Sequence, residues 1–448
     1  MPDIDRSLFK AYDVRATTGR LTPDAARWIG QAAGTLARES GFQRFAVARD
    51  GRLSSPALAA ALVEGLLAAG IDVIDLGLAA TPLLYFGAIH QAEGCGAIVT
   101  GSHNPPDYNG IKIMLGGVAV GGAALQRLAD RIERDDFAHG AGALTRCDTA
   151  PAYIAAIVAG VPQPRPLSIV IDCGNGVPGA VAPALYRALG HRVEPLYCDV
   201  DGRFPHHHPD PQDEANLADL REAVRALEAD VGLAFDGDGD RLGVITRSGQ
   251  AVPGDRLLAL FAQAALRAAP GRLVLHDVKS SRVVARCVAE AGGVSRVIPT
   301  GHVHMKRELA DRDALLAGEL SGHFAFCEWR VDDALYAGAR LLALLGAGLE
   351  LDAALAALPQ TFATPELQIA IDEPGAELVT RIAAQARFPG GEVFDIDGLR
   401  IEYPDGFGLI RASNTTPVLT LRAEGDTPAA LARIRQALAD AIAPLRLP

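Results

Sequence analysis

The sequence predicts an α/β protein: three related mixed α/β domains plus a smaller C-terminal α+β domain around a central cleft. Two observations favour this fold. A strand–helix–strand pattern occurs three times within residues 1–330, and alternating strands broken by Asp-Gly turns follow Pro359. The length of 448 residues also suggests about three or four domains. We expect the domains to span residues 1–147, 148–250, 251–360 and 361–448.

Each repeat opens with an apolar, strand-like run that ends in Asp. These runs are residues 45–50, 167–172 and 273–277. A helical pattern follows near residues 56–69, 178–189 and 281–291. After a glycine, second strands are expected at residues 71–76, 193–197 and 294–298. This order is typical of βαβ units in a largely parallel sheet.

A third short strand in each repeat ends in a polar loop. The loops are Thr100–Pro105, Asp236–Asp240 and Gly318–His323. Ligands of open α/β sheets bind at the carboxyl ends of strands. Three such loops therefore predict one shared cleft between domains.

The C-terminal part has a different pattern. A strand at 366–371 and a helix at about 374–387 precede strands separated by Asp397-Gly398 and Asp405-Gly406, which are strong hairpin signals. A last helix at roughly 427–441 begins with Thr and Pro. We interpret this part as a small antiparallel α+β domain with a hinge near residue 360.

The overall charge and the cysteines limit the classes of function. A net charge of −12 argues against non-specific nucleic-acid binding, which needs a basic surface. No uninterrupted apolar stretch approaches the ~18–20 residues of a membrane span, and the first residues do not resemble a signal peptide. The six cysteines have no CxxC pair or zinc spacing. We expect a cytoplasmic protein with reduced thiols, no membrane partner and a monomeric state.

Ser102 in the first loop is a candidate nucleophile. It follows Gly101 at a strand end and precedes His103, so we expect an exposed hydroxyl. A turn without chemistry is the alternative, because Ser, Asn and Pro are common in turns. Lys112, one of only four lysines, lies within reach of this loop and could carry a proton or hold a phosphate oxygen.

Asp236, Asp238 and Asp240 in the second loop are candidate metal ligands. Glycines between them let the backbone bend so that three carboxylates converge on one hard cation. An EF-hand does not fit, because Arg241 and Arg247 occupy positions six and twelve. A structural Asp-Gly turn is the alternative, but the carboxylates would repel one another without a cation. The ion that suits this loop beside a phosphate is Mg²⁺.

Two further segments are suited to a phosphorylated sugar. Gly318–His323 offers a carboxylate, a hydroxyl and an imidazole that suit sugar hydroxyls. Arg411–Pro417 offers a guanidinium followed by neutral donors, which suits a phosphate dianion, although a polar hairpin turn is the alternative. The histidine-rich tract Phe204–Pro211 is interpreted as a rigid, proline-bounded loop and not as a second metal site.

Four loops together resemble the α-D-phosphohexomutase family, in the family's own order and over essentially the whole chain. They are Thr100–Pro105, Asp236–Asp240, Gly318–His323 and Arg411–Pro417. Phe9–Arg15 and Asp172–Gly176 are also similar to segments of that family. The resemblance implies four domains around a central cleft, with a C-terminal domain that can close on substrate. It also implies a phosphorylated hexose as substrate and a hexose 1,6-bisphosphate as enzyme-bound intermediate and activator.

The resemblance also implies roles for particular residues. Ser102 would carry the phosphoryl group, and Asp236, Asp238 and Asp240 would hold Mg²⁺ together with an oxygen on Ser102. Lys112, with His103 or Arg15, would aid proton transfer. The implied substrate contacts are Tyr12, Lys279, His302, Glu319, Ser321, His323, Arg411, Ser413, Asn414 and Thr415.

The sequence looks closest to the bacterial phosphomannomutase/phosphoglucomutase branch of this family. Leu320 departs from the Met expected there, and glucosamine mutases differ by a Gln at that position and an Ala in place of Gly101. The alternatives are a phosphoglucosamine mutase, a non-enzymatic phosphosugar-binding protein, and a phosphatase that uses an aspartate as nucleophile. The last would need a hydroxyl residue after the aspartates, which Asp236–Asp240 lacks.

Overall fold

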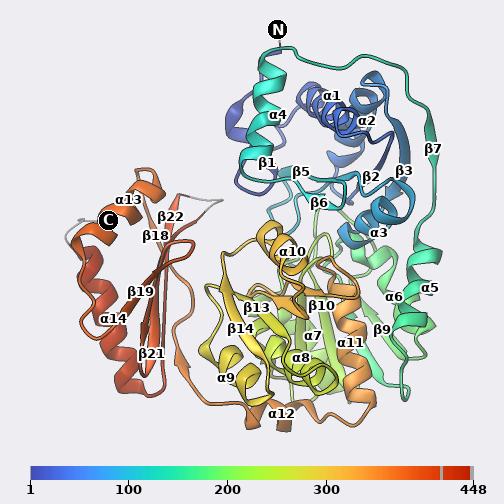
Figure 1. Ribbon diagram of the computed structural model, residues 1–448. Helices are drawn as coiled ribbons and strands as arrows, with labels where there is room; N and C mark the ends of the chain where they lie inside the picture. The colour runs from blue at the N-terminus through green and yellow to red at the C-terminus, as the bar shows by residue number, and fades with distance from the viewer. Residues whose placement is uncertain (1, 414–416, 444–448) are drawn as a thin grey trace. The chain divides into compact units, whose positions relative to one another are not determined.

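The computed structural model describes residues 2–413 and 417–443 (Figure 1). These residues form two compact units, and each is described by itself. The first unit comprises Met1–Gly254 and Ser321–Asp352, and the second comprises Asp255–Leu320 and Ala353–Pro448.

The first unit contains a mixed sheet in the order β1-β5-β4-β2-β3-β7, with β6 beside β5. Its strands are β1 (Val14–Thr17), β2 (Arg44–Arg49), β3 (Asp72–Leu78), β4 (Gly96–Val99), β5 (Tyr108–Leu115), β6 (Val118–Ala119) and β7 (Leu144–Arg146). Its helices are the 3₁₀ turn η1 (Arg6–Leu8), α1 (Pro23–Glu39), α2 (Ser55–Ala68), α3 (Thr81–Gln91) and α4 (Ala123–Glu133). β4 pairs parallel with β2 and antiparallel with β5, so its carboxyl end meets the start of β5.

Helices α1 and α2 lie side by side on one side of this sheet (Figure 1). α1 begins at Thr22, whose side chain accepts a hydrogen bond from the Ala25 N–H, with Pro23 in the first turn. Gly65 of α2 allows the close approach, since a Cβ there would lie 2.0 Å from the Arg27 carbonyl oxygen. The resulting core is continuous between these helices, α4 and the sheet.

A second sheet of the first unit has the order β12-β11-β10-β8-β9. Its strands are β8 (Ser168–Asp172), β9 (Arg192–Leu196), β10 (Val231–Phe235), β11 (Leu242–Thr246) and β12 (Ala251–Val252). The unit also contains α5 (Ala150–Gly160), η2 (Val177–Ala180), α6 (Ala182–Ala188), η3 (Glu214–Leu217), α7 (Ala218–Ala226), β16 (Phe324–Phe326) and α11 (Ala334–Gly346). β10 and β11 form an antiparallel hairpin, and the loop of three aspartates connects them.

The second unit opens with a parallel arrangement of β14, β13 and β15. These strands are β13 (Leu273–Asp277), β14 (Val294–Ile298) and β15 (Leu316–Gly318). The helices of this region are α8 (Gly254–Ala268), α9 (Arg282–Glu290), α10 (His302–Asp311) and α12 (Leu351–Ala357).

The C-terminal part of the second unit is an antiparallel sheet in the order β17-β22-β21-β20-β19, with β18 beside β22. Its elements are β17 (Phe362–Ala363), β18 (Leu367–Ala370), α13 (Gly375–Gln385), β19 (Glu392–Asp395), β20 (Leu399–Tyr403), β21 (Gly406–Ala412), β22 (Val418–Gly425) and α14 (Pro428–Ile442). Both helices pack on the same side of the sheet (Figure 1). Asp397 and Gly398 both have positive φ and lie in the three-residue loop between the paired residues Asp395 and Leu399.

These elements confirm the predicted fold class, including the α+β character of the C-terminal part. The predicted helix at 178–189 is interrupted: it forms as η2 and α6, because Gly179 and Pro183 break the helical pattern. The division into four domains at residues 147, 250 and 360 stays a prediction.

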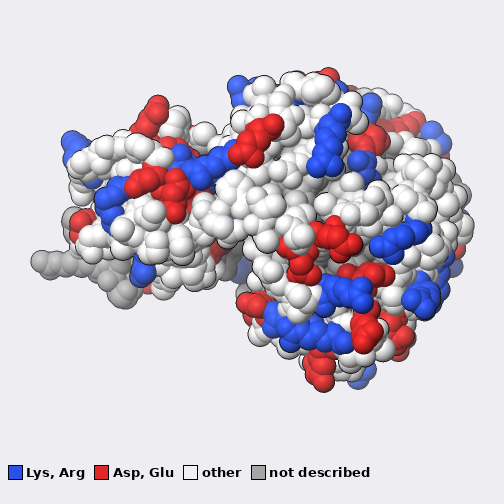
Figure 2. All heavy atoms as spheres, turned by 90° about the horizontal axis from the view of Figure 1, so that it is seen from below, with Lys and Arg blue, Asp and Glu red and all other residues white. Residues whose placement is uncertain are grey.

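The charged side chains, the cysteines and the apolar helices can each be described from the structure. On the face in Figure 2, basic and acidic side chains are interspersed and separated by uncharged areas. All six cysteines, each within the described part of the chain, are free thiols. Among the described residues no single helix has the length and apolar character of a membrane span; a bent pair, α11 with α12, meets the test by length and composition only.

Candidate active site

Ser102 lies in the turn that connects β4 to β5. Its backbone N–H donates to Thr100 Oγ1 at 2.9 Å, and its φ of +48° is in the left-handed region. The hydroxyl donates to Asp236 Oδ2 at 2.7 Å, and the residue is only 2% exposed. The expectation of an exposed hydroxyl was wrong: Ser102 Oγ is buried against a carboxylate, because the predicted metal loop, Asp236–Asp240, packs on the turn.

Glycine allows the metal loop to approach Ser102 closely. A Cβ on Gly237 would lie 2.3 Å from the Ser102 carbonyl oxygen. Asp236 Oδ1 accepts hydrogen bonds from the N–H groups of Gly239, Asp240 and Arg241, at 2.9 to 3.1 Å. One carboxylate thus closes the tight turn through Oδ1 and receives the serine hydroxyl through Oδ2.

The three aspartates of this loop converge as predicted. Asp236, Asp238 and Asp240 are fully buried, and one carboxylate oxygen of each lies within 4.8 Å of the others. Thr81 Oγ1 donates to Asp238 Oδ2 at 2.6 Å. Lys112 Nζ, on β5, donates to Asp238 Oδ2 at 2.7 Å and to Asp240 Oδ2 at 2.6 Å. The predicted nucleophile, lysine and metal ligands therefore lie together.

The charges in this cluster affect one another strongly. Burial, together with the Asp240 and Asp238 carboxylates, raises the pKa of Asp236 well above its usual range. Burial disfavours the Lys112 ammonium, but the two carboxylates that it contacts outweigh burial and raise the pKa of Lys112. Lys112 is therefore a fixed positive charge in this arrangement.

The donor set fits a hard divalent cation. Asp238 Oδ1 and Asp240 Oδ1 are buried and have no hydrogen-bond partner among the described residues. Buried carboxylate oxygens normally have such a partner, so these two are available as ligand atoms. All the donors are oxygens, which suits Mg²⁺ or Ca²⁺ better than a soft transition metal.

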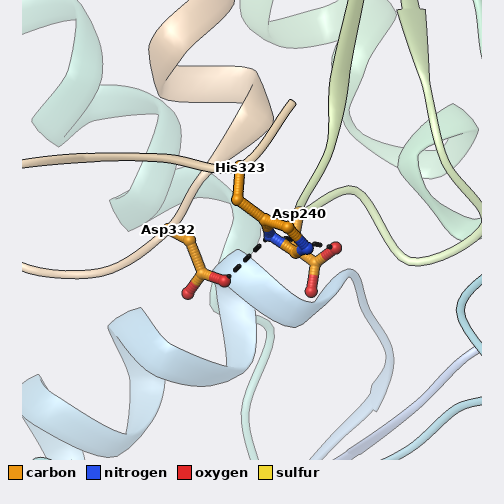
Figure 3. Close-up of side chains that lie close together, drawn as sticks. All are labelled: Asp240, His323 and Asp332. Atoms are coloured by element: carbon orange, nitrogen blue, oxygen red, sulfur yellow. Dashed lines mark ion pairs between the residues drawn. The ribbon is translucent and has the colours of Figure 1, made fainter. Parts of the chain in front are cut away.

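His323 lies next to the metal loop, between two carboxylates (Figure 3). Its Nδ1 is 3.1 Å from Asp332 Oδ2 and 3.7 Å from Asp240 Oδ1. Arg241 Nε donates to His323 Nε2 at 3.1 Å. These partners assign the ring proton to Nδ1 and leave Nε2 as an acceptor.

His103 and Arg15 flank the nucleophile turn. His103 Nδ1 lies 3.2 Å from Ser102 Oγ. Burial, followed by the charges of Arg241 and Arg15, lowers the pKa of His103 well below its usual value, so its imidazole is neutral. Arg15 Nη1 donates to Asn104 Oδ1 at 2.5 Å. Tyr12 is half-buried just before β1, in the same unit.

The predicted sugar loop is divided between the two units. Glu319 belongs to the second unit and accepts a hydrogen bond from the Gly301 N–H at 2.7 Å, whereas Ser321 and His323 belong to the first. Lys279 and His302 also belong to the second unit. Lys279 Nζ pairs with Glu366 at 2.8 Å, and His302 Nδ1 lies 2.9 Å from Lys306 Nζ.

The predicted phosphate clamp begins at the end of β21. Arg411 is buried and forms an ion pair with Asp397 at 3.0 Å. The Ser413 N–H donates to the Val418 carbonyl at 2.9 Å, which starts the return into β22. Asn414 and Thr415 lie outside the described residues.

Three residues of this region were missed by the sequence analysis: Thr81, Asp332 and Arg52. Thr81 begins α3 in a Thr-Pro pair, and Asp332 is one of two adjacent aspartates before α11. Arg52 follows Asp50-Gly51 at the carboxyl end of β2. A position at a strand end or helix start is the signal that could have identified them.

Comparisons with known families and proteins agree with this geometry. The chain matches the phosphoglucomutase/phosphomannomutase alpha/beta/alpha domains I, II and III over residues 6–139, 151–249 and 253–362, and the C-terminal domain of the same family over 366–441.

Individual relatives extend over almost the whole chain. The chain is 49% identical to a phosphoglucomutase from Neisseria gonorrhoeae, over 97% of this chain and 96% of that protein. It is 44% identical to a phosphomannomutase/phosphoglucomutase from Pseudomonas aeruginosa, over 97% and 95%. The crystal structure of a phosphoglucomutase/phosphomannomutase family protein from Burkholderia thailandensis has a TM-score of 0.92 at 46% identity, covering 98% of each chain.

Proposed function

The chain belongs to the phosphoglucomutase/phosphomannomutase family, and from this premise we propose that it interconverts hexose 1-phosphate and hexose 6-phosphate through a phosphorylated Ser102. It is an enzyme that moves a phosphoryl group between two hydroxyls of one sugar. The observation that carries the proposal is the 2.7 Å hydrogen bond from Ser102 Oγ to Asp236, within a cluster of three buried carboxylates. A nucleophile and the ligands of a charge-neutralising cation are thereby held at one place.

The bound cation is proposed to be Mg²⁺. Asp236, Asp238 and Asp240 would hold it together with an oxygen on phosphorylated Ser102, which fits the oxygen-only donor set. When bound, the cation neutralises negative charge on the phosphoryl group during its transfer. The burial of the cluster supports this role, because a charge in a site without water acts more strongly on its neighbours.

Four side chains around Ser102 supply charge and proton transfer in this proposal. Lys112 acts as a fixed positive charge, since its raised pKa keeps it protonated. Arg15 contributes a second positive charge near the turn. His103 is neutral and 3.2 Å from Ser102 Oγ, so it is placed to exchange a proton with that oxygen. His323, oriented by Asp332, is an additional acceptor at the other side of the metal loop.

The remaining predicted residues would bind the substrate away from the reacting phosphate. Glu319 and Ser321 would accept and donate hydrogen bonds to sugar hydroxyls, and Arg411 with Ser413 would hold the distal phosphate. The other proposed contacts are Tyr12, Lys279, His302, Asn414 and Thr415. The product of the first transfer, a hexose 1,6-bisphosphate, must turn around so that its other phosphate can return to Ser102. Binding groups for both ends of the sugar meet that requirement.

Glucose and mannose phosphates are the proposed substrates. The relatives that are 44–49% identical are named phosphoglucomutase or phosphomannomutase/phosphoglucomutase. The solved N-acetylphosphoglucosamine mutase from Aspergillus fumigatus is only 16% identical, so that likeness supports the fold alone. A phosphoglucosamine mutase is therefore the weaker alternative.

The first test is a comparison of initial rates on three sugar 1-phosphates: glucose, mannose and N-acetylglucosamine. The assay contains Mg²⁺ and a trace of glucose 1,6-bisphosphate. We expect turnover of the first two and little of the third. If none of the three isomerises, the mutase assignment is wrong. A bias between glucose and mannose would direct attention to Leu320.

Two variants separate the mutase from a phosphatase that uses an aspartate as nucleophile. Ser102→Ala removes the only hydroxyl proposed to carry the phosphoryl group, so it should abolish turnover and leave no phosphate on the Thr100–Pro105 peptide by mass spectrometry. Asp236→Asn should also lose activity but keep Ser102 as the modified residue. A fully active Ser102→Ala variant would contradict the proposed mechanism.

A further inference from the structure

Most backbone carbonyls of the nucleophile turn are bound by one buried arginine, Arg52. Arg52 Nη2 donates to the carbonyl oxygens of Ser102 at 2.7 Å and Asn104 at 2.6 Å. Arg52 Nη1 donates to those of Pro105 at 2.5 Å and Tyr108 at 3.0 Å. A single guanidinium thus binds four carbonyls of the turn that carries Ser102.

The His103 carbonyl, which Arg52 does not contact, is bound by the histidine-rich tract, residues 204–211. His208 Nε2 donates to the carbonyl of His103. From the same tract, the Phe204 ring packs 5.0 Å from the Arg52 guanidinium. The carbonyls of the four consecutive residues 102–105 are therefore all bound, three by Arg52 and one by His208.

Arg52 is itself held in place by Asp50. Its side chain is fully buried, and its Nε lies 3.2 Å from Asp50 Oδ2. The same Asp50 oxygen accepts a hydrogen bond from the Gly101 N–H at 3.1 Å. A Cβ on Gly101 would lie 2.5 Å from the Arg52 guanidinium, so residue 101 must be very small for this contact. Asp50 therefore holds both Arg52 and Gly101, the residue before Ser102.

This arrangement explains how Ser102 keeps an unfavourable backbone conformation. A non-glycine residue with φ of +48° is strained by about 1 kcal/mol or more, and such strain persists only when the surroundings fix it. A serine that must give and receive a phosphoryl group needs its Oγ to return to the same position in each cycle. Fixing the carbonyls on the outer side of the turn keeps the hydroxyl directed toward Asp236.

We propose that Arg52 and His208 are positioning residues that hold the Ser102 turn for phosphoryl transfer. Neither contacts the Ser102 hydroxyl, and both act through the backbone of the turn. The proposal rests on the mutase function proposed above. It also gives the histidine-rich tract a function: the tract holds the nucleophile turn, and its histidines are not in a candidate metal cluster among the described residues.

The test compares His208→Leu with His206→Leu, a matched control in the same tract. His206 Nδ1 contacts Asn175 and its ring stacks on Tyr197, away from the turn. We expect H208L to lower kcat about 10-fold with little change in KM, because leucine has no donor and one hydrogen bond of the turn is lost. H206L should keep the wild-type kcat. Both variants should unfold at similar temperatures, which separates positioning from general stability.

The second arm uses Arg52→Ala with added guanidinium chloride at a concentration far below that which unfolds the protein. We expect kcat to fall about 100-fold, as for a misplaced catalytic group, and to recover partly when free guanidinium binds the vacated position. Arg52→Lys should not restore kcat, since an ammonium cannot bind four carbonyls as a planar fork does. Single-turnover transfer from phosphorylated Ser102 should show the same loss.

Several outcomes would overturn the proposal. They are equal kcat values for H208L and H206L, an R52A variant of normal activity, or a folded R52A variant whose low kcat does not respond to guanidinium. If R52A fails to fold, the H208L and H206L pair decides alone. Wild-type protein in the same assay separates the two hypotheses: no turnover by wild type refutes the mutase function, whereas active wild type with fully active variants refutes only the positioning role.

Discussion

The Lys112 ammonium contacts two buried carboxylates, so its removal should make the stability of the first unit depend on a divalent cation. Lys112→Met keeps most of the side-chain volume but removes the charge that Asp238 and Asp240 share. Removing one partner of a buried ion pair typically costs about 3–5 kcal/mol. Protonation of one carboxylate limits this cost, so we expect K112M to lower the free energy of unfolding by about 3 kcal/mol in the absence of metal.

Mg²⁺ should recover part of this loss, because it binds the folded cluster and not the unfolded chain. A ligand at 100 times its Kd adds about 2.7 kcal/mol to the folded state. For a unit of this size, about 1 kcal/mol corresponds to roughly 2–4 °C in Tm. The assay is thermal unfolding of wild type and K112M, each with EDTA and with excess Mg²⁺. We expect a drop of roughly 6–12 °C for K112M in EDTA and a larger rise with Mg²⁺ than in wild type.

Lys279→Met is the matched control for this experiment. Lys279 is also a largely buried lysine that pairs with a carboxylate, Glu366, but it belongs to the second unit. K279M should lower Tm without changing the response to Mg²⁺. Equal responses of wild type and K112M to Mg²⁺ would refute the view that the ammonium and the cation interact with the same carboxylates.

Three further changes have expected outcomes. Gly237→Ala should lower the free energy of unfolding by about 1–3 kcal/mol and should also lower kcat, because the new Cβ would lie 2.3 Å from the Ser102 carbonyl oxygen. The control is Gly19→Ala, which has open space around it and should change neither the denaturation midpoint nor the rate. Burial lowers the pKa of His207, but Asp172, the His208 carbonyl and Asp219 together outweigh burial and raise it. The stabilising contribution of His207 is therefore complete below about pH 6.5 and is lost as pH rises through the raised folded value. His207→Gln should remove this decline in denaturation midpoints. Small-angle scattering should show compaction when a sugar bisphosphate binds, and identical profiles would contradict the hinge predicted near residue 360.

The convergence of Asp236, Asp238 and Asp240 could be predicted from the sequence because its information is local. Three aspartates within five residues, separated by glycines, leave few arrangements other than convergence. A third short strand was predicted before each polar loop, and the rule on carboxyl ends of strands then placed Ser102 in the same cleft as this loop. Both predictions depend on patterns that are contained within a few neighbouring residues.

The contacts around this core could not be predicted, because they join residues far apart in the chain. Thr81 and Asp238 are 157 residues apart in sequence, and Arg52 lies 50 residues before Ser102. No periodicity or local motif encodes such a pair. The burial of Ser102 also follows from tertiary packing, since the turn itself has the composition of an exposed loop.

The presence of a lysine, and not an arginine, at position 112 has a physical explanation in these contacts. Lys112, Lys279 and Lys306 are all buried, at 5%, 9% and 6% exposure, in a chain whose other basic side chains are nearly all arginine. Lys112 Nζ reaches two carboxylates from one point, whereas the planar guanidinium of arginine favours a paired contact with one. A compact ammonium satisfies Asp238 and Asp240 through one oxygen each and leaves Oδ1 of both without a hydrogen-bond partner among the described residues. A lysine at this position therefore keeps ligand atoms free for a cation, which a larger forked group would cover.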